Sequence, residues 1–457
     1  MQTITTDKII ELANVQAASL PDDALAMVKL SLLDWLVCAR AGIEEPLAAG
    51  LRKFAAAETA TSVTSVTSDT SGTVGPASIA GGGRAPVRLA AMVNGAISHA
   101  LDYDDTHFAH VGHLSVGIYP AVVATGEDID ASVTDLIAAF LLGAETAIRT
   151  GCVLGTDHYN RGFHQTATAG AFGATVATAR LRGLDEQQLR YAIGLCASRA
   201  SGLKSQFGTM GKPLNAGFSA ANGVEATALA ACGLTSAEDG LMGEQGFVPT
   251  HTTNESIQAE AQAWTDPPPD HFRFINNSYK FHACCHGTHA MIEGLSALVQ
   301  KQECKPQEIS SIEVRTNPRW LKVCDIDNPQ TGLEVKFSYR WLAAMVFHGL
   351  ATADDSVYTT ELAQGNMLAE LAGKVSVTGD DLLTDQQVQG KVCLSNGKEM
   401  PYSHDLEGQV DTGVLELRLL EKAQTVLGLK SEALLSLYER FDNLSARELG
   451  KYLGSSA

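Results

Sequence analysis

The stretch His164–Arg180, HQTATAGAFGATVATAR, decides the fold of this chain. Ala, Gly and Thr fill most of its positions, and small side chains let helix backbones approach one another closely. This composition predicts a central helix over residues 166–181 that other helices surround on all sides. His164 stands at the entrance of the helix, which therefore resembles the wall of a pocket.

Helical patterns continue on both sides of this stretch. Apolar residues recur at helical spacing from Pro21 to Gly42, with Asp22 and Asp23 in the first turn and Gly42 as a stop. Similar patterns predict helices over residues 132–151, 185–200, 219–232 and 288–299. The first two-thirds of the chain is therefore expected to be mostly helical, and no internal repeat is visible.

The composition changes at residues 265–270, TDPPPD, which indicates a domain boundary. Strand patterns follow over residues 309–316, 374–378 and 391–400, the last with an Asn396-Gly397 turn. These patterns predict a smaller α+β domain over residues 268–405. The tail is helical again, notably over 431–441, and it either closes this domain or returns to the first. Residues 61–83, rich in Ser, Thr and Gly, predict a loop with a short hairpin.

The overall composition limits the possible partners. The 457 residues include 33 Lys and Arg against 52 Asp and Glu, a formal net charge of −19, which argues against nucleic acids and anionic membranes. Only 19% of the residues are charged, which favours an oligomer. Nine scattered cysteines and an N-terminus without an apolar core predict a cytoplasmic protein with reduced thiols. An anionic substrate would need cations focused in one pocket.

The densest polar cluster is residues 102–113, DYDDTHFAHVGH, which follows an apolar helical segment. Three acids, two hydroxyls and three imidazoles in a dozen residues exceed what a solvated turn requires. A polar loop after a helix is a good place for a general base. The alternative is a set of turns and caps with incidental histidines.

A second cluster, residues 280–289, KFHACCHGTH, follows the expected boundary. Metal ligation has to be considered for two sets, one here and one in the first cluster. Neither set has the spacing of H-E-x-x-H or of paired C-x-x-C motifs, and adjacent cysteines suit a tetrahedral site poorly, so no metal is predicted. The two sets are His282, Cys284, Cys285, His286 and His289, and His107, His110 and His113.

Lys212 stands alone among small and apolar residues in the segment 207–214, FGTMGKPL. It either binds a carboxylate or caps the preceding helix with its charge in water. The chain lacks G-x-G-x-x-G after a strand, G-x-x-x-x-G-K-[ST] and G-x-S-x-G, so nicotinamide, nucleoside triphosphate and serine-hydrolase chemistry lack support. The chemistry is therefore expected to come from side chains alone.

With these residues in view, the chain resembles the MmgE/PrpD family. The resemblance lies in four ordered segments: VNGAISHALDYDDTHFAHVGHLS, the GFH before the small-residue helix, FGTMGKPLNAGFSAANGVEATALA, and KFHACCHGTHA. The family includes 2-methylcitrate dehydratase, cis-aconitate decarboxylase and iminodisuccinate epimerase. The resemblance implies a large helical domain (residues 1–267 and 406–457), an inserted α+β lid domain (268–405), a homodimer and no cofactor.

The resemblance also implies roles for single residues. His113 matches an imidazole that the family places before Pro-Ser, although Leu114 stands here instead of that proline, and His110 is the alternative imidazole. Asp102 and Thr106 match the acid and hydroxyl of the family's D-[FY]-D-D-T segment. The remaining matches are His164 (G-[FW]-H), Lys212 (K-P) and Lys280, the basic residue where the lid begins.

These residues suit proton transfer next to a carboxylate of a small di- or tricarboxylic acid. Dehydration, decarboxylation and epimerisation all need cations on the carboxylates and an imidazole that moves a proton near neutral pH. We expect a cofactor-independent lyase in which His113, Asp102, His164 and Lys212 are catalytic and Thr106, Lys280 and His110 bind substrate. The alternatives are an epimerase or isomerase of a similar acid, a non-catalytic binding protein, and a metal-dependent hydrolase.

Overall fold

The computed structural model describes residues 4–63, 75–253, 256–301, 304–407 and 411–455. The chain divides into two compact units, Met1–Tyr279 with Leu427–Ala457, and Lys280–Val426. The first unit is helical and the second is α+β, as the sequence predicts. Both boundaries lie later in the chain than residues 267/268 and 405/406, and the segment from Leu427 rejoins the first unit.

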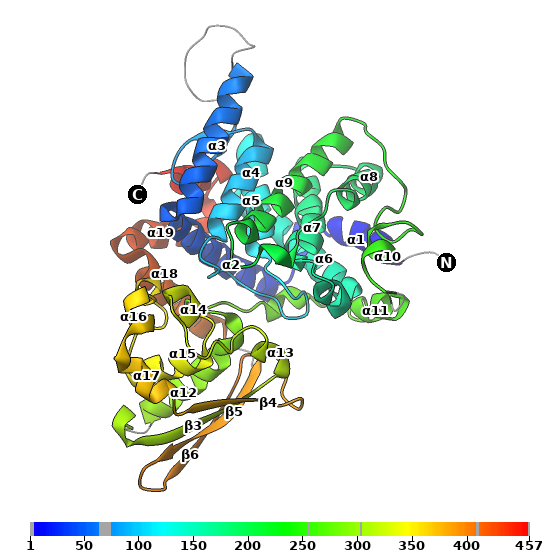
Figure 1. Ribbon diagram of the computed structural model, residues 1–457. Helices are drawn as coiled ribbons and strands as arrows, with labels where there is room; N and C mark the ends of the chain where they lie inside the picture. The colour runs from blue at the N-terminus through cyan, green and yellow to red at the C-terminus, as the bar shows by residue number, and fades with distance from the viewer. Residues whose placement is uncertain (1–3, 64–74, 254–255, 302–303, 408–410, 456–457) are drawn as a thin grey trace. The chain divides into compact units, whose positions relative to one another are not determined.

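The helical unit is built mainly from long helices (Figure 1). Short two-residue strands β1 (Ala77–Ser78) and β2 (Arg84–Ala85) pair antiparallel, so a hairpin begins in the predicted stretch 61–83, but its second strand lies just beyond that stretch. Residues 61–63 end helix α3 instead of belonging to a loop, and residues 64–74 lie outside the described residues. The helices are α1 (Ile4–Ala13), α2 (Asp22–Ala41), α3 (Pro46–Val63), α4 (Val87–Ser98), α5 (Ser115–Ile129), α6 (Val133–Asn160), α7 (Gln165–Arg182), α8 (Glu186–Ala197), α9 (Gly211–Ala231), α10 (Phe247–His251), α11 (Ser256–Ala263), α19 (Ser431–Tyr438) and α20 (Ala446–Gly454).

Helix α7 is central, as the small-residue stretch predicts. It contacts α5, α6, α8 and α9, and every residue from Gln165 to Ala179 is buried. The contact with α6 is a close backbone approach, because a Cβ on Gly173 would lie 2.6 Å from the carbonyl oxygen of Gly143. Small residues are therefore required on both helices at this crossing.

Helix α6 is longer than the predicted 132–151 helix and continues to Asn160 through a kink at Gly155. Ser132 caps its first turn by accepting a hydrogen bond from the backbone N–H of Asp135. Among the described residues, α6 alone is long and apolar enough to cross a membrane, but 94% of its apolar window is buried by the rest of the protein. Its apolar composition is that of a core helix.

A buried ion pair explains why residues 268–279 belong to the helical unit. Arg149 and Glu145 on α6 are 2.7 Å apart and fully buried. The Arg149 guanidinium also donates to the carbonyl oxygens of Ala263 and Asp266, each at 2.7 Å. The Glu145 carboxylate accepts from the backbone N–H of Phe274 at 3.1 Å. The Pro-rich segment is thus bound to α6, and the chain leaves the unit only after Tyr279.

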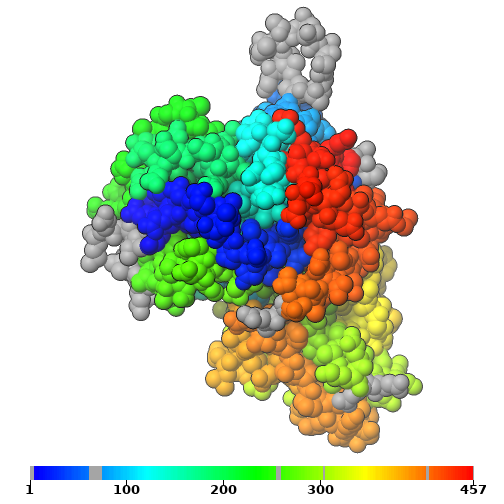
Figure 2. Space-filling model, turned by 180° about the vertical axis from the view of Figure 1, so that it is seen from behind, coloured from blue at the N-terminus to red at the C-terminus, as the bar shows by residue number. Residues whose placement is uncertain are grey.

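The returning C-terminal segment packs against the start and middle of the helical unit (Figure 2). Lys29 on α2 forms an ion pair of 2.6 Å with Asp442, and Arg40 donates to the carbonyl oxygen of Ser455 at 2.6 Å. Arg447 on α20 donates to the carbonyl oxygen of Glu127 at 3.1 Å. These contacts hold the two ends of the chain in one unit.

The second unit holds a four-stranded sheet of order β4-β3-β5-β6. Strand β3 (Ile309–Thr316) is parallel to β4 (Val375–Gly379) and antiparallel to β5 (Gln387–Leu394), which is antiparallel to β6 (Glu399–Asp405). Gly397, at φ +85°, lies in the predicted turn between β5 and β6. Helices α12 and α15 contact the sheet (Figure 1). The helices are α12 (His289–Lys301), α13 (Pro318–Leu321), α14 (Gly332–Val335), α15 (Tyr339–Phe347), α16 (Thr360–Gln364), α17 (Asn366–Ala372) and α18 (Thr412–Leu427).

Candidate active site

The polar loop after α4 folds back onto the start of α7. Asp102 and Val111 both have positive φ, +52° and +56°, a backbone conformation that non-glycine residues rarely adopt. The backbone N–H of His113 donates to the Thr166 hydroxyl of α7 at 3.0 Å. Gly112 fits against the same turn, where a Cβ would lie 2.8 Å from the backbone nitrogen of Thr166. The loop is therefore fixed on the central helix.

Asp104 lies between two imidazoles. Its Oδ1 is 2.7 Å from Nδ1 of His99, and its Oδ2 is 2.8 Å from Nδ1 of His113. The rings of His99 and His113 meet edge to face at 4.5 Å. All three side chains are buried, so the loop and the end of α4 form one dry imidazole–carboxylate group.

The opposite nitrogen of His113 faces an ion pair. Asp102 has Oδ1 3.5 Å from Nε2 of His113 and Oδ2 2.6 Å from Nζ of Lys212 on α9. The Asp102 side chain is 33% exposed and Lys212 is 16% exposed, so this side of the group is closer to solvent than Asp104. A lysine, an acid and an imidazole nitrogen thus converge there.

His164 completes the group from the start of α7. Its Nδ1 is 3.2 Å from the Asn215 amide of α9, and its ring centroid is 6.4 Å from that of His113 and 5.0 Å from that of Phe207. Burial and the nearby Lys212 ammonium hold the pKa of His164 well below its usual range. His164 is therefore a neutral imidazole at physiological pH.

The two buried acids of the loop titrate in opposite directions. Burial alone would raise the pKa of Asp104, but the imidazoles of His99 and His113 outweigh it and hold that pKa well below its usual range. Burial and the neighbouring Asp104 raise the pKa of Asp105 to about 7. Asp105 accepts from the Ser115 hydroxyl at 2.6 Å and the Asn277 amide at 2.8 Å. Asp104 is therefore the permanent anion of the pair.

For the other predicted site residues the structure gives the following positions. Thr106 pairs with Ser278 through two backbone hydrogen bonds of 2.8 Å. His110 points to α6, with Nδ1 3.1 Å from the Ala147 carbonyl, and burial together with His107 lowers its pKa to about 3. Lys280 is buried at the start of the second unit. The structure therefore brings together Asp102, His113, His164 and Lys212.

Sequence reasoning missed His99 and Asp104. Both stand in the segment that carries the resemblance, but three acids within four residues gave no reason to choose Asp104 over Asp102. His99 is the last position of a helical pattern, where a lone histidine is usually a satisfied core residue. Nothing in the sequence marks the helix end at Ser98, after which both residues follow in the chain.

The same residues include a set of potential metal ligands. Among the described residues, one set of potential ligands gathers within 4.8 Å, namely His99, Asp102, Asp104 and His113. The Lys212 ammonium lies 2.6 Å from Asp102, where a metal cation would compete with it, and Asp104 already spans two imidazoles. This donor set fits an ion-pair network with its own cation rather than a metal site.

The second histidine cluster is held by neutral partners and one acid. His282 contacts the Thr352 hydroxyl at 2.8 Å and Glu293 at 3.3 Å, and His289 lies 3.4 Å from the Cys284 carbonyl. Burial raises the pKa of the Cys284 thiol to about 12, so this thiol is protonated. The described contacts of this cluster are thus hydrogen bonds and one ion pair.

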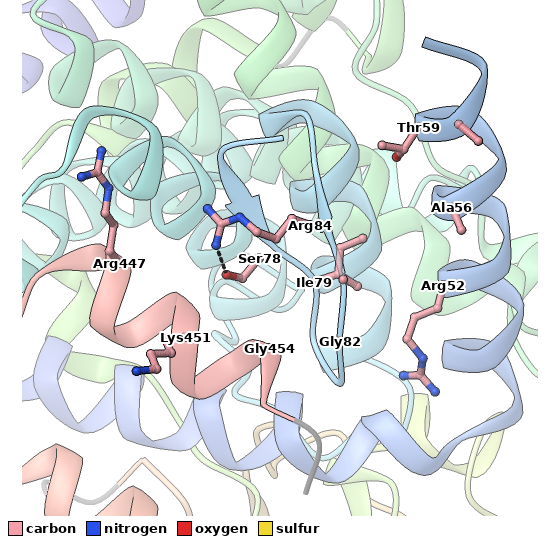
Figure 3. A pocket seen from close by; sticks show the side chains of 12 residues that line it. Arg52, Ala56, Thr59, Ser78, Ile79, Gly82, Arg84, Arg447, Lys451 and Gly454 are labelled. Atoms are coloured by element: carbon pink, nitrogen blue, oxygen red, sulfur yellow. Dashed lines mark hydrogen bonds between the residues drawn. The ribbon is translucent and has the colours of Figure 1, made fainter. Parts of the chain in front are cut away.

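A separate pocket of about 800 Å³ in the helical unit is lined by Arg52, Arg84, Arg447 and Lys451 (Figure 3). Its arginines point in different directions and bind the protein itself. Arg84 donates to the Gly75 carbonyl at 3.1 Å, and Arg52 donates to the Ile43 carbonyl at 3.2 Å. These cations tie chain segments together, so the buried imidazole–carboxylate group remains the candidate site.

The fold and the site together define a mainly helical protein with a buried group suited to proton transfer next to a cation. Models of the MmgE/PrpD N-terminal and C-terminal domains match residues 11–260 and 282–401, so the chain belongs to the MmgE/PrpD family. The resemblance stated from the sequence is thereby confirmed.

Several curated relatives are named cis-aconitate decarboxylase. The Aspergillus terreus protein is 28% identical over 309 residues, which are 63% of this chain and 59% of that protein. The Homo sapiens protein is 31% identical over 169 residues, 36% of this chain and 35% of that protein. The Mus musculus protein is 32% identical over 162 residues, 33% of this chain and 32% of that protein. The chain thus matches less than two-thirds of the length of these relatives.

Proposed function

We propose that the chain is a cofactor-independent lyase that removes CO2 or water from a small di- or tricarboxylic acid. The observation that carries the proposal is the placement of His113, with Nδ1 2.8 Å from the buried Asp104 and Nε2 facing the Asp102–Lys212 ion pair. Decarboxylation is the leading reaction, because the similar proteins are named cis-aconitate decarboxylase.

In this mechanism Lys212 leaves Asp102 to bind a substrate carboxylate, since an ammonium is a compact cation that can change partners. The bond to the departing carboxylate breaks and its electron pair remains on the substrate carbon. The imidazolium of His113 gives that carbon the proton on Nε2, CO2 leaves, and solvent reprotonates His113. Asp104 stabilises the imidazolium throughout because it stays ionised.

An epimerase of a similar acid is the second candidate. His113 and His164 present two imidazoles with ring centroids 6.4 Å apart, and an epimerase needs proton exchange on two faces of one carbon. The same proton transfer without loss of a group would invert the carbon.

The decisive experiment follows a panel of citrate, 2-methylcitrate, cis-aconitate, iminodisuccinate, tartrate and malate by proton NMR in D2O. We expect the substrate to lose one carboxylate and the carbon that carried it to gain one deuterium. Deuterium in an unchanged skeleton would establish the epimerase instead. No change in any acid of the panel would contradict both candidates and favour a binding protein.

A matched pair of lysine variants tests whether Lys212 takes part in turnover. Lys212→Met removes the cation beside Asp102 and is expected to reduce turnover at least 100-fold. Lys204→Met is the control, because the Lys204 ammonium lies over the Tyr159 ring at 3.5 Å and donates to the Tyr159 carbonyl at 3.1 Å. Equal activity of the two variants would contradict the role of Lys212.

The proposal also includes a cytoplasmic homodimer. The support is the family resemblance, the low charged fraction and the nine cysteines, all of them free thiols in the structure. Light scattering on the purified protein should give twice the mass of the 48.3 kDa chain. The mass of a single chain would contradict the dimer without touching the proposed chemistry.

A further inference from the structure

Two carboxylates lie close enough to His113 to orient it. Asp104 is 2.8 Å from Nδ1, and Asp102 is 3.5 Å from Nε2. Asp102 is one-third exposed and lies closer to Lys212, at 2.6 Å, whereas Asp104 is fully buried. Distance, burial and competition for partners therefore all favour Asp104 as the stronger partner of His113.

We infer that Asp104, rather than Asp102, is the positioning residue for His113, and that His99 positions Asp104. The inference rests on the proposed function, because it assigns how the proposed acid–base residue is held. Asp102 is left to hold Lys212 until a substrate carboxylate replaces it.

The first consequence is the tautomer of His113. A carboxylate oxygen 2.8 Å away repels a nitrogen lone pair and attracts an N–H, so the imidazole nitrogen beside Asp104 carries the proton. Asp104 is ionised at neutral pH, since its pKa lies well below the usual range. Neutral His113 then has its proton on Nδ1 and a lone pair on Nε2, the nitrogen that faces Asp102. The nitrogen that exchanges the proton and the Lys212 cation are thereby placed on one side of the ring.

The second consequence concerns His99, whose Nδ1 lies 2.7 Å from Asp104. The ring is 1% exposed, and its Nε2 has no hydrogen-bond partner among the described residues. A proton on Nε2 would be an unsatisfied buried donor, which is costly, so the proton of His99 lies on Nδ1 and points at Asp104. His99 therefore acts as a fixed donor that keeps Asp104 turned toward His113.

Tautomers can be measured without any turnover. In protein labelled with ¹⁵N at histidine, two-bond nitrogen–proton couplings distinguish Nδ1–H from Nε2–H rings. We expect His113 and His99 both to be Nδ1–H in the unliganded protein at a pH high enough for His113 to be neutral, with His113 assigned by its absence in His113→Asn. An Nε2–H ring at His113 would overturn the inference, whatever the protein proves to catalyse.

Two aspartate variants test the division of roles. Asp104→Asn keeps the shape but puts an amide donor or a neutral acceptor beside Nδ1, and we expect kcat to fall by about 10²–10⁴ while KM changes only a few-fold. Asp102→Asn should change mainly KM, because it removes the ion-pair partner of Lys212 and leaves the orientation of His113 unchanged. The reverse pattern, with kcat lost in Asp102→Asn and kept in Asp104→Asn, would contradict the inference but leave the lyase proposal standing.

Substitution of His99 separates positioning from packing. In His99→Asn the side-chain amide can replace Nδ1–H as donor to Asp104, whereas His99→Leu fills the space without a donor. We expect the Asn variant to retain most of kcat and the Leu variant to lose at least tenfold. Equal losses would mean that His99 only fills space. The pH above which turnover falls should also move to lower pH in Asp104→Asn, because His113 loses an anionic neighbour.

The pH profile of turnover depends on all the titratable groups near His113. The titratable neighbours of His113 within the described part of the helical unit lie just after α4, in the loop, just before α7 and on α9. They include His99, Asp102, Asp104, His110, His164 and Lys212. The shift in Asp104→Asn must therefore be compared with that in Asp102→Asn, where the charge is also removed but the Nδ1 partner remains. A larger shift in Asp102→Asn would oppose the inference.

Discussion

The molecule contains two histidine-rich segments that differ in what surrounds their imidazoles. The loop segment, residues 99–113, interleaves histidines with carboxylates, and one carboxylate, Asp104, spans two rings at 2.7 and 2.8 Å. The thiol segment, residues 280–289, interleaves histidines with cysteines, and His289 is held by a backbone carbonyl. The number of histidines is similar, but the loop segment has a carboxylate of its own between two imidazoles, whereas the acid beside His282, Glu293, lies outside the thiol segment.

The difference has an electrostatic consequence. Burial and the neighbouring His286 and His282 hold the pKa of His289 well below its usual range, so the ring is neutral. In the loop segment, the negative charge of Asp104 favours a proton on His113 instead. A histidine cluster in a sequence thus indicates proton chemistry mainly where acids are interleaved with it.

The largest effect is expected from substitution of His113, the proposed acid–base residue of the loop segment. His113→Asn keeps a donor toward Asp104 but has no group at Nε2, and we expect kcat on the substrate found by NMR to fall by about 10²–10⁴. His110→Asn is the matched variant, since His110 lies against the Ala147 carbonyl on α6. We expect His110→Asn to lower the unfolding temperature while changing kcat only slightly. Loss of turnover in His110→Asn alone would assign the acid–base role to His110.

The next largest effect is on the free energy of unfolding and comes from Asp105, the second buried acid of the loop segment. Burial raises the pKa of Asp105 to about 7, so the folded protein binds this proton more tightly than the unfolded chain. Stability is therefore fully present below about pH 4 and is lost as the pH rises toward and past 7, by roughly 4 kcal/mol in all. In Asp105→Asn this loss should be absent.

Urea unfolding at pH 5 and pH 8 measures this difference. The Asn277 amide beside Asp105 can turn its buried, unpartnered Oδ1 toward the new amide group, so Asp105→Asn is expected to fold. The parent should lose more stability than the variant between the two pH values. Parallel losses would show that another group carries the pH dependence.

Glu293, the acid that contacts His282 of the thiol segment, should respond to pH in the opposite direction. Burial would raise the pKa of Glu293, but the hydrogen bond from His282 and the Arg418 guanidinium lower it to about 2. Its stabilisation is present above about pH 4.5 and is lost as the pH falls toward 2. Glu293→Gln should therefore cost roughly 3 kcal/mol at pH 7 and progressively less on acidification.

Acid titration of parent and Glu293→Gln by circular dichroism tests this sign. The two curves should converge near pH 2, where Glu293 of the parent becomes protonated. Curves that stay equally far apart from pH 7 to pH 2 would show that Glu293 acts through packing and not through its charge.

Much of the fold could be predicted because local patterns and tertiary packing agree. The small residues of α7 predict its central place, and the Asn396-Gly397 turn predicts the β5–β6 hairpin. A boundary was predicted at the Pro-rich segment, but the observed boundary after Tyr279 could not be predicted, since the Arg149 contacts that bind the Pro-rich segment to α6 join residues more than 110 positions apart. Composition alone does not report such contacts.

The candidate site was predicted less completely. Lys212 and His113 were found from residue type and resemblance, but Asp104 and His99 were not. The choice among neighbouring acids depends on how the loop turns, and the left-handed backbone at Asp102 turns Asp102 toward Lys212 and leaves Asp104 inside. One unusual φ angle thus separates two roles that are equivalent in the sequence.

The smallest expected effect lies in the thiol segment. The Cys284 thiol is buried and protonated, with Sγ 3.2 Å from the Thr288 hydroxyl, so it serves as a small apolar side chain with a weak polar contact. Cys284→Ala should therefore cost about 1 kcal/mol of unfolding free energy and leave the metal content of the purified protein unchanged. Elemental analysis of both proteins provides the control. One zinc ion per chain in the parent and none in the Cys284→Ala variant would make Cys284 a ligand. The contrast between the two histidine-rich segments would then be one between proton transfer and metal binding.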